Sequence, residues 1–193
     1  MCGKFLPNEV DGKIYYVLQA IDAFKMGYKP MLLATESELD ELLFHPFFIR
    51  HKHLYLFFHS EAHKRGFLKK TKGIPWNSLE FERILGLCLG MPPKAVDLYI
   101  RVKALGVAGK FEKMEELIKK RIGISFAGIT CVCHVEDLVE NAHWFWERYD
   151  FPELMQYPLE VWSKSDFHFV NYGDTTKLKE IQKEILEGEW RGS

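Results

Sequence analysis

Residues 121–149 read RIGISFAGITCVCHVEDLVENAHWFWERY, and this stretch decides the class of fold. In its first half, apolar residues alternate with small or polar ones around Ala127 and Gly128, which predicts a strand or a hairpin. Its second half carries apolar residues at helical spacing. They are Val135, Leu138, Val139, Ala142, Phe145, Trp146 and Tyr149. A strand unit followed directly by an amphipathic helix predicts a fold in which helices cover a sheet.

The rest of the chain shows the same mixture of patterns. Residues 54–58, LYLFF, form a continuous apolar run that is typical of a buried strand. Apolar residues at helical spacing recur in several other segments, among them 14–24 and 78–88. We therefore predict an α/β or α+β protein with one small mixed sheet under six or seven helices, in a single domain spanning residues 1–193. Residues 153–174 are expected to be an irregular, aromatic-rich segment with possible edge strands.

Composition narrows the class of protein. Aromatic residues make up 15% of the chain, which predicts a dense core or an aromatic-lined groove. The formal net charge is −1, so no overall attraction to nucleic acid or to an anionic membrane is expected. No apolar stretch approaches the roughly twenty residues that span a bilayer. The amino terminus lacks a signal-peptide pattern, so we expect a cytoplasmic protein whose four cysteines are reduced.

Histidine and cysteine residues give a signal for metal chemistry. His59 and His63 are four residues apart, so they share a face if this segment is helical. Cys131 and Cys133 share a face if theirs is a strand, and His134 follows directly. Two thiolates and two imidazoles satisfy tetrahedral zinc. If the two strands that end at these residues are neighbours, the five side chains would meet in one zinc or iron site, or in a thiol-dependent one. The alternative is a core strand and a surface histidine pair.

Residues 79–100 also contain a helix–turn–helix pattern. Two helical segments flank the break Gly90–Pro93, and in such motifs the second helix enters the major groove of DNA. Lys94, Arg101 and Lys103 would then face phosphates. The second helix offers few side chains that read base edges, and it carries an aspartate that would repel the DNA backbone. Nucleic acid is therefore the less favoured partner.

Aromatic residues crowd the last third of the chain. Trp144 falls outside the apolar stripe of its helix, beside His143, and Trp162 lies in a possible edge strand. Most such rings serve the core, but exposed ones can line a groove for a planar ligand or a protein partner. We therefore expect a binding protein that uses an aromatic-lined face made by these three residues, rather than an enzyme. No oligomeric state is predicted.

Two resemblances to known families add little chemistry. The opening Met-Cys-Gly is similar to the start of N-terminal-nucleophile glutamine amidotransferases and DNA-crosslinking proteases, in which Cys2 would be the nucleophile. The downstream motifs of both families are missing from the sequence.

The second resemblance is broader. Residues 79–100, LEFERILGLCLGMPPKAVDLYI, resemble the Glu-Phe-Pro-His-Glu-Ile-Gly and Leu-Gly-Tyr-Pro motif of an uncharacterised bacterial family. The turn at residues 27–30 and the strand at 54–58 fall in that family's order. Glu82 and Arg83 replace its Pro-His pair. The resemblance implies a bacterial or phage-like protein and a shared fold unit, and it assigns no activity.

Overall fold

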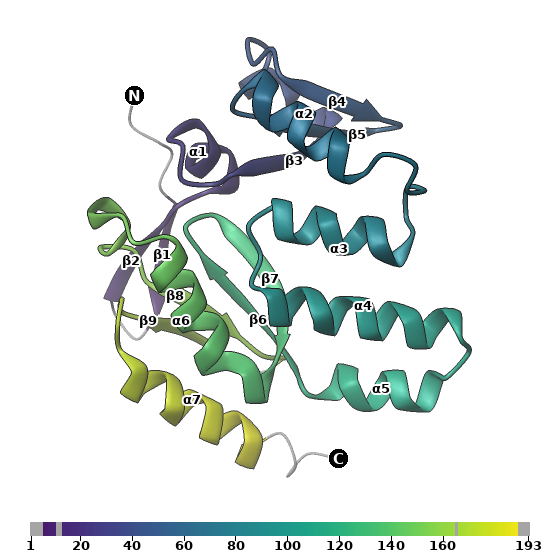
Figure 1. Cartoon of the computed structure of the whole chain (residues 1–193). Coiled ribbons are helices and arrows are strands. Elements are labelled where there is room, and N and C mark those ends of the chain that lie inside the picture. Colours follow the sequence, from purple (N-terminus) through teal and green to yellow (C-terminus); the bar gives the residue numbers. More distant parts are fainter. Residues whose placement is uncertain (1–5, 11–12, 165, 189–193) are drawn as a thin grey trace.

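The computed structural model describes residues 6–10, 13–164 and 166–188, which form helices around three separate β units (Figure 1). In chain order the elements are β1 Leu6–Val10, β2 Lys13–Val17, α1 Ala20–Lys25, β3 Met31–Thr35, the 3-10 helix η1 Glu36–Glu41, β4 Phe48–His51, β5 Leu54–Phe58, α2 Glu61–Lys70, α3 Leu79–Cys88, α4 Pro93–Val107, α5 Phe111–Lys119, β6 Arg121–Phe126, β7 Ile129–His134, η2 Val135–Asp137, α6 Leu138–Arg148, η3 Pro152–Leu154, β8 Leu159–Trp162, β9 Phe167–Val170 and α7 Thr175–Gly188. A mixed α/β fold is confirmed, with seven α-helices in the described part, as predicted.

The strands are divided over three antiparallel units instead of the single sheet that we predicted. β1 and β2 form a hairpin, β3-β5-β4 form a three-stranded sheet, and β7-β6-β8-β9 form a four-stranded sheet. The expected neighbours, the strand at residues 54–58 and the hairpin at 121–134, therefore belong to different sheets. The physical reason is that β4–β5, β6–β7 and β8–β9 are sequence neighbours, and short connections make antiparallel pairing inexpensive in chain entropy.

Two local predictions are corrected by the structure. The segment 14–24 is not one helix, because β2 ends at Val17 and the short helix α1 follows it. Residues 153–174 are more regular than expected, since they supply β8 and β9 to the four-stranded sheet. Both strands that we predicted in this segment are present, but only β9 is an edge strand, because β8 pairs with β6 on its other side.

The four-stranded sheet and α6 share the main core. The predicted stripe of α6 is confirmed: Leu138, Ala142 and Phe145 have no exposed surface. They pack with Ile124 of β6 and Val161 of β8, which are also completely buried. Figure 1 shows α7 beside α6, and α3, α4 and α5 stacked as a separate group. Burial of this apolar surface is what holds the helix against the sheet.

Polar contacts connect the two larger sheets. The Lys29 ammonium, just before β3, donates to the carbonyl oxygen of Gly128 in the β6–β7 turn at 3.0 Å. The Tyr149 hydroxyl, at the end of α6, donates to the carbonyl oxygen of Gly90 at 3.1 Å. The first bond fixes the β6–β7 turn against the chain just before β3, and the second fixes the end of α6 against the connection between α3 and α4. The candidate site lies beside the second bond.

Candidate functional site

An open cleft of about 520 Å³ lies between α2, the end of α3 and α6. Helix α2 presents His63, Phe67 and Lys70 to it, and α6 presents Trp144 and Arg148. Residues three, four or seven positions apart share one face of a helix, so each helix turns a single side toward the cleft. The other lining residues are Pro30, Met31, Phe58, Ala62, Gly66, Leu87, Cys88, Gly90 and Tyr149.

Helix α2 is fixed at both ends and in the middle. The Ser60 hydroxyl accepts a hydrogen bond from the His63 amide at 3.2 Å, which caps the helix. Phe67 is buried and packs on Phe58 of β5, with ring centroids 5.6 Å apart. Lys70 lies in the last turn, where the helix dipole favours a cation. The buried ring of Phe67 therefore anchors the helix, which presents His63 and Lys70 to the cleft.

The aromatic wall of the cleft comes from α6. The Trp144 ring meets the Tyr149 ring edge to face, with centroids 6.0 Å apart and planes at 72°. Burial raises the pKa of Tyr149 to about 12, so its hydroxyl stays protonated and keeps donating to Gly90. The wall is therefore neutral and fixed by a buried hydrogen bond.

The charge of the cleft is one-sided. His63, Lys70 and Arg148 line it, and no aspartate or glutamate is among the described residues that do so. Within the described ranges, neither Lys70 nor Arg148 forms an ion pair with a carboxylate. Burial raises the pKa of the Cys88 thiol, against a weaker opposing effect of Lys70. The thiol is therefore neutral, and the cleft as a whole carries positive charge.

The predicted metal centre is not assembled. The His59 ring stacks on Phe24 at 4.3 Å, and its Nε2 is hydrogen-bonded to the Lys29 carbonyl oxygen at 2.8 Å. The His63 ring is 6.4 Å from that of His59 and lies on the cleft. In the part of the chain that the structure describes, no group of three or more His, Cys, Asp and Glu side chains could hold a metal ion.

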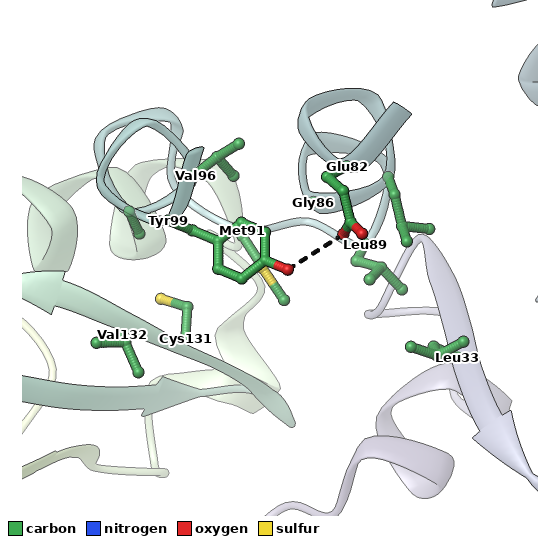
Figure 2. A pocket seen from close by; sticks show the side chains of 11 residues that line it. Leu33, Glu82, Gly86, Leu89, Met91, Val96, Tyr99, Cys131 and Val132 are labelled. Atoms are coloured by element: carbon green, nitrogen blue, oxygen red, sulfur yellow. Dashed lines mark hydrogen bonds between the residues drawn. The ribbon is translucent and has the colours of Figure 1, made fainter. Parts of the chain in front are cut away.

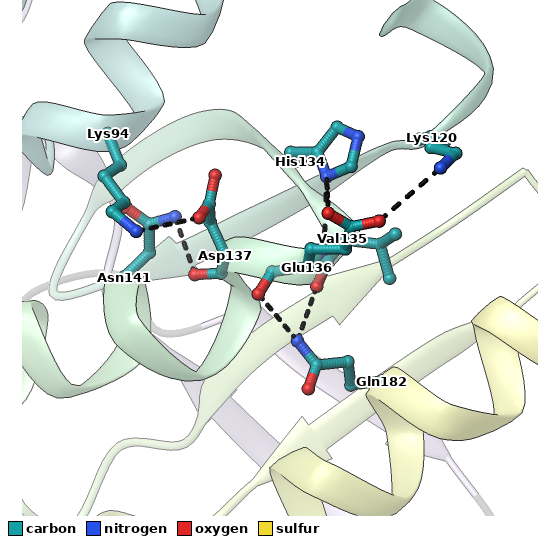
Figure 3. A network of polar contacts seen from close by, with 8 residues as sticks. All are labelled: Lys94, Lys120, His134, Val135, Glu136, Asp137, Asn141 and Gln182. Carbon is teal, nitrogen blue, oxygen red and sulfur yellow. Dashed lines mark hydrogen bonds and ion pairs between the residues drawn. The ribbon is translucent and has the colours of Figure 1, made fainter. Parts of the chain in front are cut away.

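The two cysteines of β7 share a face, as predicted, but that face is the core. Burial raises the pKa of Cys133 to about 12 and that of Cys131 well above its ordinary value. His134 points elsewhere: its Nδ1 accepts from the Glu136 amide at 3.3 Å (Figure 3). The three residues thus lie in the four-stranded sheet, whereas His59 directly follows β5 of the three-stranded sheet. Cys2 lies outside the described residues.

The predicted basic face is largely neutralised. Lys94 binds Asp137 at 3.0 Å and Glu140 at 2.6 Å, and Figure 3 shows the first of these pairs at the start of α6. Lys103 binds Glu82 at 2.6 Å. Arg101 is exposed on the same helix. Two of the three predicted phosphate contacts thus serve to attach α4 to its neighbours.

The three predicted aromatic-face residues are separated by the fold. Trp144 lies in the cleft. His143 points to α7, where its Nε2 is hydrogen-bonded to the Thr175 hydroxyl at 2.8 Å. Trp162 lies on the four-stranded sheet and lines a different cavity. Sequence reasoning missed Lys70 and Arg148; the four-residue spacing of Trp144 and Arg148 was the available signal.

A second cavity, of about 330 Å³, lies between α3, α4 and the outer strands β3 and β7 (Figure 2). Its walls are almost entirely apolar, with Leu33 on one side and Val132 on the other. Glu82 and Tyr99 are its polar members, and they are engaged: Glu82 binds Lys103, and the Tyr99 hydroxyl donates to Glu82 at 3.4 Å. This cavity could accept an apolar group, but its charged side chain, Glu82, is already paired with Lys103.

Replacing Tyr149 by phenylalanine should cost about 1 kcal/mol of stability, because the Gly90 carbonyl oxygen loses a buried donor. Urea denaturation of the two proteins measures this. Tyr99→Phe is the matched control, since the exposed Tyr99 makes only a long bond of 3.4 Å and should change stability by much less. Equal losses in both variants would show that the Tyr149 bond does not hold the cleft wall.

No protein-family model matches the chain, and neither the curated proteins nor the solved structures contain a significant match to it. The resemblance to the uncharacterised bacterial family therefore stays a prediction. Among the described helices, none is both long and apolar enough to cross a membrane. Function is inferred from the geometry of the cleft.

Proposed function

We propose that the protein is a non-enzymatic binding protein whose cleft takes a small anion with a planar or apolar body. The observation that carries the proposal is the pairing of Lys70 and Arg148 with the Trp144 wall, with no carboxylate among the lining residues. The volume of about 520 Å³ falls within the range of roughly 300–1,000 Å³ that small-molecule sites occupy.

Each part of the cleft matches one part of such a ligand. A carboxylate or phosphate oxygen would accept charge-assisted hydrogen bonds from the guanidinium of Arg148 and the ammonium of Lys70. A planar ring would pack against Trp144, since aromatic pairs favour offset or edge-on contact. The neutral Cys88 thiol adds apolar surface and no nucleophile. These properties support recognition rather than covalent catalysis.

The test compares 2-naphthoate with its neutral amide, 2-naphthamide, by titration calorimetry. We expect 2-naphthoate to bind at least about tenfold more tightly, because a charge-assisted hydrogen bond contributes about 1.5–3 kcal/mol. Arg148→Gln and Lys70→Gln should each weaken binding of 2-naphthoate about tenfold, while binding of 2-naphthamide stays unchanged.

Lys69→Gln is the matched control for Lys70→Gln. Lys69 is the preceding residue on α2, is exposed and does not line the cleft. Equal binding of the acid and the amide, or an equal loss in Lys69→Gln and Lys70→Gln, would contradict the proposed site.

A further inference from the structure

A third cavity, of about 240 Å³, lies on the face of the four-stranded sheet opposite the main core. Its floor is one row of paired residues: Thr130 of β7 lies beside Ser125 of β6, which lies beside Glu160 of β8. Trp162 follows two residues after Glu160 and therefore projects from the same face. The junction of β2 and α1, residues 17–20, forms the opposite wall.

The hydroxyl groups orient the carboxylate. The Thr130 hydroxyl donates to the Ser125 hydroxyl at 3.2 Å, and Ser125 is hydrogen-bonded to Glu160. One hydrogen bond leaves acceptor positions on a carboxylate unfilled, because its two oxygens offer about four. Among the residues that the structure places, no Lys, Arg or His pairs with Glu160. A half-buried carboxylate with a fixed orientation and no cation is thus turned toward an open space.

The indole of Trp162 is fixed beside this carboxylate. It lies directly on Gly123, where any side chain would overlap the ring, and it stacks with Phe167 at 6.2 Å and 12°. An aromatic face attracts a cation, and tryptophan does so most strongly. The Glu160 carboxylate and the Trp162 indole therefore both favour a cation.

We propose that the cavity bounded by Glu160, Trp162, Ser125 and Thr130 binds an organic ammonium group. The carboxylate would supply the countercharge, and the indole would contact the alkyl substituents that carry part of the positive charge. The volume of about 240 Å³ is smaller than that of most whole-ligand sites, which suits a head group whose remainder extends outward. This site is separate from the cleft on α2 and α6 and has the opposite charge preference.

Titration of Glu160 gives the site a pH dependence. Burial raises the pKa of Glu160, and the Ser125 hydrogen bond opposes this more weakly. Among the residues whose side chains the structure describes, no other titratable group lines this cavity. Lys29 is nearby but donates to the Gly128 carbonyl. The cation requires the ionised carboxylate, so affinity rises as pH increases through the pKa of Glu160.

The test titrates the 193-residue protein with benzyltrimethylammonium, which keeps its charge at every pH, and with benzyl alcohol as a neutral comparison. We expect saturable quenching of tryptophan fluorescence by the cation and at least about tenfold weaker binding of the alcohol. Glu160→Gln should lose about tenfold for the cation and become independent of pH. Trp162→Leu should lose roughly threefold or more, together with the quenching.

Glu112→Gln controls for the change in net charge, since Glu112 is exposed on α5. The affinity of the unsubstituted protein for the cation is also measured as a function of pH. This measurement needs no variant, so misfolding of a variant cannot affect it. Circular dichroism checks that each variant is folded. If the cleft functions as proposed, binding of 2-naphthoate gives a second check. Unchanged cation affinity in Glu160→Gln, equal binding of alcohol and cation, or a flat pH profile would overturn the proposal.

Discussion

Replacing Gly90 by alanine is expected to destabilise the protein by about 3 kcal/mol and to abolish ligand binding in the cleft. Gly90 has a φ of +87°, which costs an alanine about 1–2 kcal/mol. The added methyl group would overlap the Tyr149 hydroxyl and lie 3.1 Å from the Pro30 ring. Tyr149 would have to move, which removes its buried hydrogen bond and costs about 1–3 kcal/mol more.

Gly73→Ala separates the cost of a positive φ from the cost of overlap with neighbouring side chains. Gly73 has a similar φ of +77°, but an added methyl group would meet no atom within 4 Å. It should therefore cost only the conformational part, about 1 kcal/mol, and leave the cleft intact. Chemical denaturation of both variants gives the comparison. Equal losses would mean that the packing of Tyr149 and Pro30 around Gly90 contributes nothing.

Replacing Lys29 by methionine is expected to stabilise the protein by about 1 kcal/mol at pH 7. Lys29 is only 8% exposed, and burial lowers its pKa from 10.5 to about 8, against a weaker opposing effect of Glu38. This change corresponds to about 3 kcal/mol against the charged form. Methionine keeps the apolar stem and removes the charge, and it gives up a charge-assisted hydrogen bond to Gly128 worth about 2 kcal/mol.

The stability gained by Lys29→Met should decrease as pH rises. Below pH 8 the amine is protonated in both states, so folding carries the full cost of burying the charge. Between pH 8 and 10.5 the unfolded chain binds more protons, so the stability contributed by Lys29 rises with pH. The advantage of Lys29→Met should therefore disappear across this range.

The quantity to measure is the difference in free energy of unfolding between Lys29→Met and the unsubstituted protein at each pH. Buried tyrosines and cysteines also titrate at high pH, but they affect both proteins equally and do not change this difference. Lys113→Met, on the exposed side of α5, should show neither the gain nor the pH dependence. A Lys29→Met variant that is less stable at pH 7, with a difference that does not change with pH, would contradict this account.

Local patterns predicted the elements better than their arrangement. The stripe of α6 and the strand β5 were evident because periodicity and apolar runs directly reflect burial. The division into separate sheets was not, because the β3–β5 and β6–β8 pairings that complete the two larger sheets join strands that are not adjacent in the chain. Segment 14–24 was misassigned because Ile14, Val17, Leu18, Ile21 and Phe24 recur at helical spacing, whereas the pairing of β2 with β1 depends on residues outside this segment.

The candidate site was predictable only in part. Trp144 was found because it falls outside the apolar stripe of its helix. Lys70 and Arg148 were not, since they lie on different helices, α2 and α6, and line the same cleft only in the folded chain. The cysteines of β7 were placed correctly on one face, but the sequence could not show that this face is covered by the core.

The most direct test of the proposed cleft is to observe which tryptophan responds to 2-naphthoate. The chain has five tryptophans, whose indole N–H groups give separate signals in a ¹H–¹⁵N spectrum, and Trp144→Phe identifies that of Trp144. We predict that the Trp144 signal shifts saturably while the Trp162 and Trp76 signals do not. A shift of Trp162 with Trp144 unchanged, or no saturable shift of any indole, would contradict the assignment of the cleft as the ligand site.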